Sequence, residues 1–131
     1  MVRLFIVRHA KAAKGEPDEI RPLTEEGRKQ ARELGKQFAA GGIRPGAILT
    51  SPLLRARETA EEIGRAVGVD PEADERLAPG ADADAVRAAT AERGEVVIVV
   101  GHQPDCGRIA ATLSGGPEPA FPTAGVFAVE V

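Results

Sequence analysis

The sequence predicts a single α/β domain, built as a three-layer α/β/α sandwich around a mostly parallel sheet. Short apolar runs alternate along the chain with longer amphipathic segments, which is the pattern of parallel strands connected by helices. One run, residues 96–100, contains only β-branched residues, as expected for a central strand covered on both faces. The length of 131 residues suits one core, so we assign residues 1–131 to a single domain.

A strand, a loop and a helix are expected at the start of the chain. The apolar run at residues 2–10 ends in an arginine and a histidine, which is typical of a buried strand that delivers polar groups to a sheet edge. Residues 10–22 lack a hydrophobic period and predict a loop. Thr24 is a favourable N-cap for a helix over residues 25–40. The expected buried positions of this helix are Gly27, Ala31, Leu34, Gly35 and Phe38.

A second strand and helix are expected next. Residues 47–50 are apolar and follow a Pro-Gly pair, which predicts a short strand. Ser51 and Pro52 then supply an N-cap and a proline at the first helical position, so we expect a helix over residues 52–67.

The second half of the chain continues the alternation. At most a short strand is expected near residues 73–77, and Asp84 is expected to cap a helix that runs to about Glu92. Pro104 is expected to start the last helix, and residues 125–131 predict a final strand.

Composition and charge exclude several classes of partner. The net charge of −3 gives no overall attraction to a nucleic-acid backbone or an anionic membrane, so we expect neither partner. The only cysteine, Cys106, cannot form a disulfide within the chain and is expected to be a small core residue. We identify neither a signal peptide nor a transmembrane run, and we expect a soluble cytoplasmic protein.

Polar side chains follow three of the predicted strands. Arg8 and His9 follow the first strand, Ser51 and Arg55 follow the second, and His102 follows the central one. A single histidine in a protein is most often a surface residue or a satisfied core residue. Both histidines of this chain, however, follow apolar strands, and the carboxyl ends of parallel strands meet at one edge of a sheet. We therefore expect these side chains to form one pocket.

Such a pocket would bind phosphate. Arg8 and Arg55, with Arg21 as a further candidate, would present forked donors to a tetrahedral oxyanion. An imidazole among arginines is expected to have a lowered pKa, which leaves a nitrogen lone pair free to attack phosphorus and form a phosphohistidine intermediate. The second histidine, if protonated, would neutralise charge on the phosphoryl oxygens in the transition state. This chemistry needs neither metal nor cofactor, and the chain has no H-E-x-x-H motif.

Four short motifs follow one another along the chain. They are R-H-A at residues 8–10, R-P-L-T-E-E-G-R-K-Q-A at 21–31, T-S-P-L-L-R-A-R-E-T-A at 50–60 and V-V-G-H-Q-P at 99–104. Together they resemble the signatures of the histidine phosphatase superfamily, and the resemblance implies the phosphoglycerate-mutase-like fold. The short length and the R-P-L-T stretch look most like the SixA-type phosphohistidine phosphatases.

The resemblance implies a role for each matching residue. His9 would be the phosphorylated nucleophile, Arg8 and Arg55 would hold the phosphate, and His102 would be the second histidine of the pocket. We expect Arg21 and Ser51 to contact the substrate.

The chain departs from the family pattern at two places. Ala10 replaces a glycine of the first motif, which adds one methyl group near the pocket. Larger members carry a general acid after the third strand, where this chain offers only Asp74 or Glu75 as candidates, without a motif to fix either. The alternative is that both are solvated loop carboxylates. A missing acid would suit phosphohistidine as substrate, because imidazole departs more readily than an alkoxide.

Three functions remain open from the sequence. The first is a phosphohistidine phosphatase that acts on a phosphohistidine-bearing protein through a covalent intermediate on His9. The second is a phosphomonoesterase of small phosphorylated metabolites such as sugar phosphates, because such enzymes share the same catalytic residues. The third is a phosphate-recognition module without turnover, although a pure binder need not keep a nucleophile.

Overall fold

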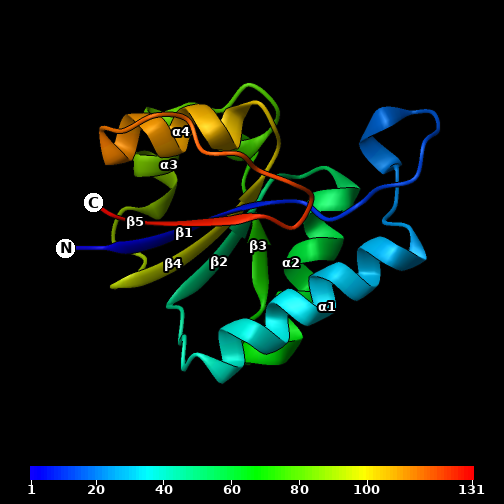
Figure 1. The fold of residues 1–131 in the computed structure, drawn as a ribbon, viewed down its shortest axis with the longest axis horizontal. Coiled ribbons are helices and arrows are strands. Elements are labelled where there is room, and N and C mark those ends of the chain that lie inside the picture. The colour runs from blue at the N-terminus through cyan, green and yellow to red at the C-terminus, as the bar shows by residue number, and fades with distance from the viewer.

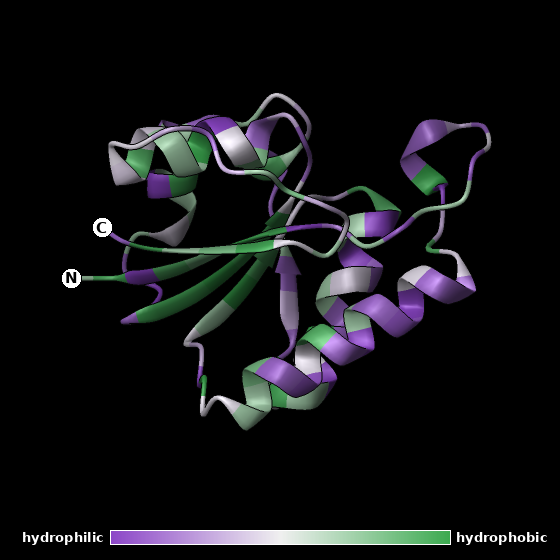
Figure 2. Cartoon of the chain, viewed as in Figure 1, coloured by the Kyte–Doolittle hydropathy of each residue, from purple (hydrophilic) through white to green (hydrophobic).

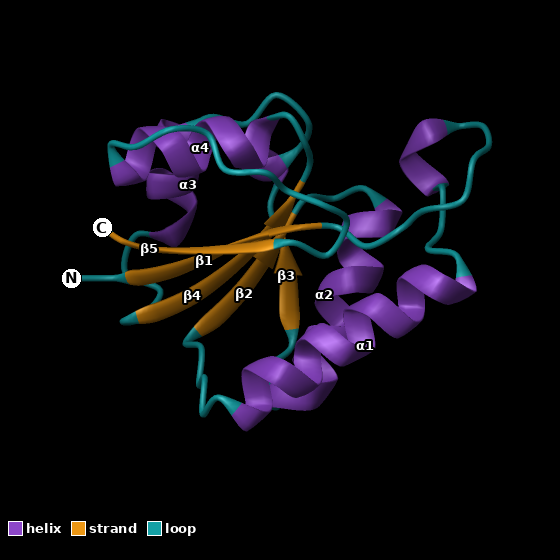
Figure 3. Cartoon of the chain, in the orientation of Figure 1, coloured by secondary structure: helices purple, strands orange, loops and turns teal.

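A five-stranded sheet forms the middle of the protein, which we describe over residues 1–131 from a computed structural model. The strand order is β3-β2-β4-β1-β5, so β4 is the central strand (Figure 1). β1 to β4 are parallel, and β5 pairs antiparallel with β1 at one edge, which confirms a mostly parallel sheet (Figure 3). The strands are β1 (Arg3–Arg8), β2 (Ala47–Thr50), β3 (Pro71–Ala73), β4 (Val96–Gly101) and β5 (Val126–Glu130).

Helices cover both faces of the sheet, which confirms the three-layer sandwich. α1 and α2 pack on one face, and α3 and α4 pack on the other (Figure 1). None of these helices combines the length and the apolar character that a membrane crossing requires. The helices are α1 (Glu25–Ala40), α2 (Leu54–Val67), α3 (Ala83–Thr90) and α4 (Asp105–Ser114), with the single-turn 3₁₀ helices η1 (Asp18–Ile20) and η2 (Glu75–Leu77).

Each face of the sheet has its own core, because successive side chains of a strand point to opposite sides. Leu4 and Ile6 of β1 pack with α3 and α4, whereas Phe5 and Val7 pack with α1 and α2. All the predicted inward positions of α1 are buried. Figure 2 shows the apolar residues concentrated in the strands and polar residues along the outer side of α1.

The register of the sheet brings three strand ends together. Arg8 of β1 pairs with Gly101 of β4, and the ladder continues with the hydrogen bond from the His9 N–H to the Gly101 carbonyl (3.0 Å). On the other side of β4, the Ser51 N–H donates to the Val100 carbonyl (3.0 Å). The residues that follow β1, β2 and β4 therefore lie at one edge, as the sequence predicts.

The boundaries of α3 differ from the prediction. Its N-cap is Asp82, which has an extended backbone and accepts a hydrogen bond from the Ala85 N–H (2.8 Å), so the predicted cap at Asp84 is wrong. The helix ends at Thr90 rather than at Glu92, because Glu92 has a left-handed backbone with φ of 59°.

The start of α2 and the position of the short strand after it also differ from the prediction. α2 starts at Leu54, because the Ser51 hydroxyl accepts the Leu53 N–H (3.2 Å) and fixes a turn before the first helical residue. The short strand after α2 is β3, whereas the region that follows it forms η2, in which Asp74 accepts the Arg76 N–H (2.9 Å). Local side-chain hydrogen bonds thus shift both elements.

Candidate active site

His9 follows β1 and is held by the adjacent backbone. Its Nδ1 lies 2.7 Å from the carbonyl oxygen of Ala10. Because a carbonyl oxygen only accepts, Nδ1 carries the proton, and in the neutral ring Nε2 keeps a free lone pair. Burial lowers the pKa of His9, the Ala10 hydrogen bond opposes this effect, and the charges of Arg55 and Arg8 lower it further. The predicted lowering is confirmed, but burial rather than the arginines is its main cause.

His102 follows the central strand and is almost fully buried. Its ring centre lies 5.3 Å from that of His9. Burial, followed by the proximity of His9 and the charge of Arg55, lowers the pKa of His102 to about 4. His102 is therefore neutral at pH 7, a protonation state that the sequence had left open. In this neutral state its free ring N–H can donate a hydrogen bond to a phosphoryl oxygen.

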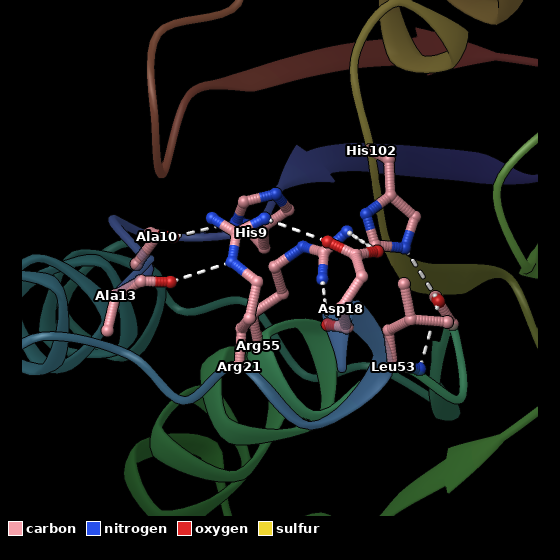
Figure 4. A network of polar contacts seen from close by, with 9 residues as sticks. His9, Ala10, Ala13, Asp18, Arg21, Leu53, Arg55 and His102 are labelled. Carbon is pink, nitrogen blue, oxygen red and sulfur yellow. Dashed lines mark hydrogen bonds and ion pairs between the residues drawn. The ribbon is translucent and has the colours of Figure 1, made fainter. Parts of the chain in front are cut away.

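Ser51 determines which nitrogen of His102 carries the proton. Its Oγ accepts the Leu53 N–H and lies 2.7 Å from His102 Nε2, and because the Ser51 hydroxyl has no other acceptor within reach, it donates its proton to Nε2. His102 then carries its proton on Nδ1, which is buried and has no partner within the protein. In Figure 4 this nitrogen lies on the side of the ring that faces His9. Ser51 itself is fully buried and contacts His102, and its direct contact with a substrate stays a prediction.

Arg8 and Arg55 are anchored so that part of each guanidinium remains available. Arg8 Nη1 donates to the Phe121 carbonyl (2.9 Å), while its buried Nε has no partner. Arg55, in the first turn of α2, is only 7% exposed and donates from Nη1 to the Asp18 carbonyl (2.9 Å). Unpaired or weakly paired buried donors are costly unless a ligand satisfies them, which is consistent with an anion site.

Asp18 also belongs to the site, although sequence reasoning did not identify it. Its Oδ2 accepts from Arg55 Nη2 (3.2 Å), and its Oδ1 accepts from Arg21 Nη1 (2.9 Å). Arg21 is further held by the Ala13 carbonyl, which accepts from its Nε (2.7 Å). Arg21 thus does reach the pocket, but through Asp18. No signal marks one carboxylate within an aperiodic loop, so Asp18 could not be found from spacing.

Thr59 is a second residue that sequence reasoning missed. Its Oγ1 accepts the Ala10 N–H (3.0 Å) and donates to the Arg55 carbonyl (2.8 Å). Thr59 therefore ties the segment that carries His9 to the turn of α2 that carries Arg55. Ala10 is fully buried in this arrangement, so the methyl group that replaces the family's glycine packs inside the protein.

The two candidate acids lie after β3. Both oxygens of Asp74 accept hydrogen bonds from the Arg76 guanidinium, at 3.0 Å to Nε and 2.8 Å to Nη2, and this lowers the pKa of Asp74. Glu75 is exposed, and its side chain forms no hydrogen bond or ion pair. A paired aspartate with a lowered pKa is a poor proton donor at neutral pH.

A surface groove of about 790 Å³ contains neither histidine. It runs between α2 and β3, and its lining includes side chains of both charges, Arg57, Glu61, Arg65 and Asp70. No group of three or more His, Cys, Asp or Glu side chains is placed to hold a metal ion.

Comparisons with known proteins place this geometry in a family. The sequence model of a protein family, described as the histidine phosphatase superfamily (branch 1), matches residues 4–79, more than half of the chain. The phosphohistidine phosphatase SixA of Escherichia coli (strain K12) is 31% identical over 134 residues, which cover 97% of this chain and 83% of that protein. An uncharacterized protein of Picosynechococcus sp. is 36% identical over 124 residues, which cover 88% and 74%.

The fold agrees with the sequence comparison. A structure of the protein histidine phosphatase SixA complexed with tungstate matches with a TM-score of 0.90 and 31% identity, over 99% of this chain and 88% of that chain. The putative phosphohistidine phosphatase SixA from Agrobacterium tumefaciens matches with a TM-score of 0.85 and 28% identity, over 98% and 91%.

Proposed function

The chain belongs to branch 1 of the histidine phosphatase superfamily and is a phosphatase, and we propose that its substrate is phosphohistidine carried on another protein. The likeness to proteins named SixA, over nearly the whole chain, supports this choice. Tungstate, which one of those structures contains, is a tetrahedral oxyanion like phosphate. We further propose that the protein acts in phosphoryl signalling in the cytoplasm.

In the proposed reaction His9 is the nucleophile. Its free Nε2 attacks phosphorus, the P–N bond of the substrate breaks, and the bonding pair stays with the leaving imidazole. Arg8 and Arg55 hold the phosphoryl oxygens, and Nδ1–H of His102 donates to one of them. Water then attacks phosphorus of the phosphorylated His9, which releases inorganic phosphate and restores the neutral ring.

The observation that carries the choice of substrate is the pairing of Asp74 with Arg76. An alkoxide leaving group needs a proton donor, and the aspartate that follows β3 is held ionised by that arginine. An imidazole leaving group is less demanding. The site is thus better equipped for a phosphoramidate than for an alkyl or sugar phosphate.

We also propose that the reaction is independent of a metal ion. The pocket presents the guanidinium groups of Arg8, Arg21 and Arg55 against the single carboxylate of Asp18, so its net charge attracts an anion and repels a divalent cation. Activity is therefore expected to be unchanged after treatment with EDTA.

A direct comparison of substrates tests the function. The purified protein is offered a histidine-phosphorylated protein and, separately, p-nitrophenyl phosphate, and phosphate release is measured for wild type, His9→Ala and the exposed control Lys29→Ala. We expect preference for the phosphohistidine protein, loss of release in His9→Ala and no change in Lys29→Ala. Equal release by wild type and His9→Ala would sink the nucleophile assignment, and hydrolysis of small esters alone would identify a phosphomonoesterase.

A further inference from the structure

The Asp18 carboxylate lies on the anion-binding side of two pocket arginines. It accepts from Arg21 through Oδ1 and from Arg55 through Oδ2. In Figure 4 the carboxylate lies between the rings of His9 and His102. The two arginines hold the carboxylate as they would hold a phosphoryl group, so a substrate must displace it.

The backbone of Asp18 stays at the pocket when its side chain is displaced. Its carbonyl accepts from Arg55 Nη1, and the base of its loop is closed by the hydrogen bond from the Ala13 N–H to the Pro22 carbonyl (2.8 Å). The side chain is 52% exposed, so it is free to turn from the arginines toward solvent. The displaced carboxylate therefore remains within one side-chain length of the bound phosphoryl group and faces whatever is attached to it.

A carboxylate at this position favours one charge type of substrate over another. A phosphate ester brings a dianion and a neutral leaving group, and the Asp18 charge repels it without compensation. A phosphohistidine ring protonated on its second nitrogen brings an N–H with positive charge, which a carboxylate binds in a charge-assisted hydrogen bond. The same residue thus attracts one substrate and rejects the other.

We propose that Asp18 selects phosphohistidine over phosphate esters by accepting a hydrogen bond from the protonated imidazole of the substrate. This inference rests on the proposed function and names the residue that gives the site its specificity. By keeping the substrate ring protonated, Asp18 also makes a general acid for the leaving group unnecessary. The proton is already on the second ring nitrogen, so when the P–N bond breaks the bonding pair returns to the first nitrogen and neutral imidazole leaves, rather than the far more basic imidazolate.

The test compares Asp18→Asn with the matched control Glu19→Gln, a neighbouring exposed carboxylate in η1 without a side-chain contact. The values of kcat/KM are measured for a histidine-phosphorylated peptide and for p-nitrophenyl phosphate. For Asp18→Asn we expect a loss of about tenfold with the peptide, because a charge-assisted hydrogen bond is removed, and a severalfold gain with the ester. With the peptide, the pH above which kcat/KM falls should also decrease by about one unit. Without the negative charge of Asp18, the substrate ring loses its proton at a lower pH. Glu19→Gln should change neither.

Each other outcome overturns the inference. Equal gains with both substrates would mean that Asp18 only obstructs the anion site. Equal losses with both substrates would mean that Asp18 has only a structural role, and no change with either would mean that it has no role in the reaction. The wild-type preference between the two substrates reports separately on the proposed function, so a wild type that prefers the ester rejects that function whatever Asp18→Asn does.

Discussion

His9 and His102 follow neighbouring strands of the sheet, but the protein holds their rings in opposite ways. His9 is partly exposed and gives its Nδ1–H to the Ala10 carbonyl, which leaves Nε2 free to react. His102 is buried and bonds through Nε2 to Ser51, which leaves Nδ1–H without a protein partner. One histidine therefore presents a lone pair and the other presents a proton.

This difference is set by hydrogen bonds to the protein rather than by charge. Both rings have a lowered pKa and both are neutral at pH 7. A neutral imidazole is a nucleophile or a donor according to which nitrogen carries the proton. The Ala10 carbonyl and the Ser51 hydroxyl determine this for the two rings, so in the proposed reaction one neutral ring serves as the nucleophile and the other as a hydrogen-bond donor.

The largest expected effect is a loss of kcat that differs between variants of the two histidines. His9→Ala should lower kcat for a histidine-phosphorylated peptide by on the order of 10⁴-fold or more, because the covalent route is lost. His102→Ala should lower it by about 10²- to 10³-fold, because only one donor to the phosphoryl oxygens is lost. Equal losses in the two variants would remove the distinction between them.

A third variant tests whether His102 acts as a neutral donor. His102→Asn keeps an N–H near the position of Nδ1 but cannot become a cation, so it should recover part of the activity lost in His102→Ala. If His102→Asn were as inactive as His102→Ala, a protonated His102 would be the better account.

A smaller effect is expected when the tautomer of His102 is released. Ser51→Ala should lower kcat about tenfold with little change in KM, because His102 no longer holds its proton on Nδ1. The matched control is Ser114→Ala at the end of α4. ¹⁵N chemical shifts of the His102 ring report the tautomer directly, and an unchanged tautomer in Ser51→Ala would reject the role of Ser51.

A separate effect is expected on stability rather than on the rate. The pKa of His102 is about 4 in the folded protein against an ordinary value of 6.5, so between these pH values the unfolded chain binds the extra proton. The free energy of unfolding should therefore be fully retained above pH 6.5 and fall by roughly 2–3 kcal/mol as the pH drops toward 4. The free energy of unfolding, measured with urea between pH 4 and 6.5, should depend less on pH in His102→Asn than in the wild type. An equal slope would mean that His102 is not the group that titrates.

The layers of the fold were predictable because apolar periodicity reports which side of an element is buried. The β-branched run of β4 and the inward positions of α1 gave the central strand and its covering helix. Element boundaries were less predictable where neighbouring polar residues compete. Asp82 and Asp84 are both good caps by type, and only the backbone conformation at Asp82 decides between them.

The site was predictable where a side chain follows a strand directly. Arg8, His9 and His102 lie where the parallel register must bring them together. Asp18 was not predictable, because its place depends on the path of an aperiodic loop. The protonation state of His102 could not be predicted either, since the depth of burial that sets its pKa is a property of the packed structure.

The most direct test of the division between the two histidines is to locate the transferred phosphoryl group. A single turnover with a histidine-phosphorylated peptide is stopped with alkali, which preserves phosphohistidine, and the protein is digested and mapped by mass spectrometry. We predict phosphate on His9, with none on His102, and no trapped species in His9→Ala. Phosphate on His102, or wild-type turnover without any phosphorylated enzyme, would contradict the assignment.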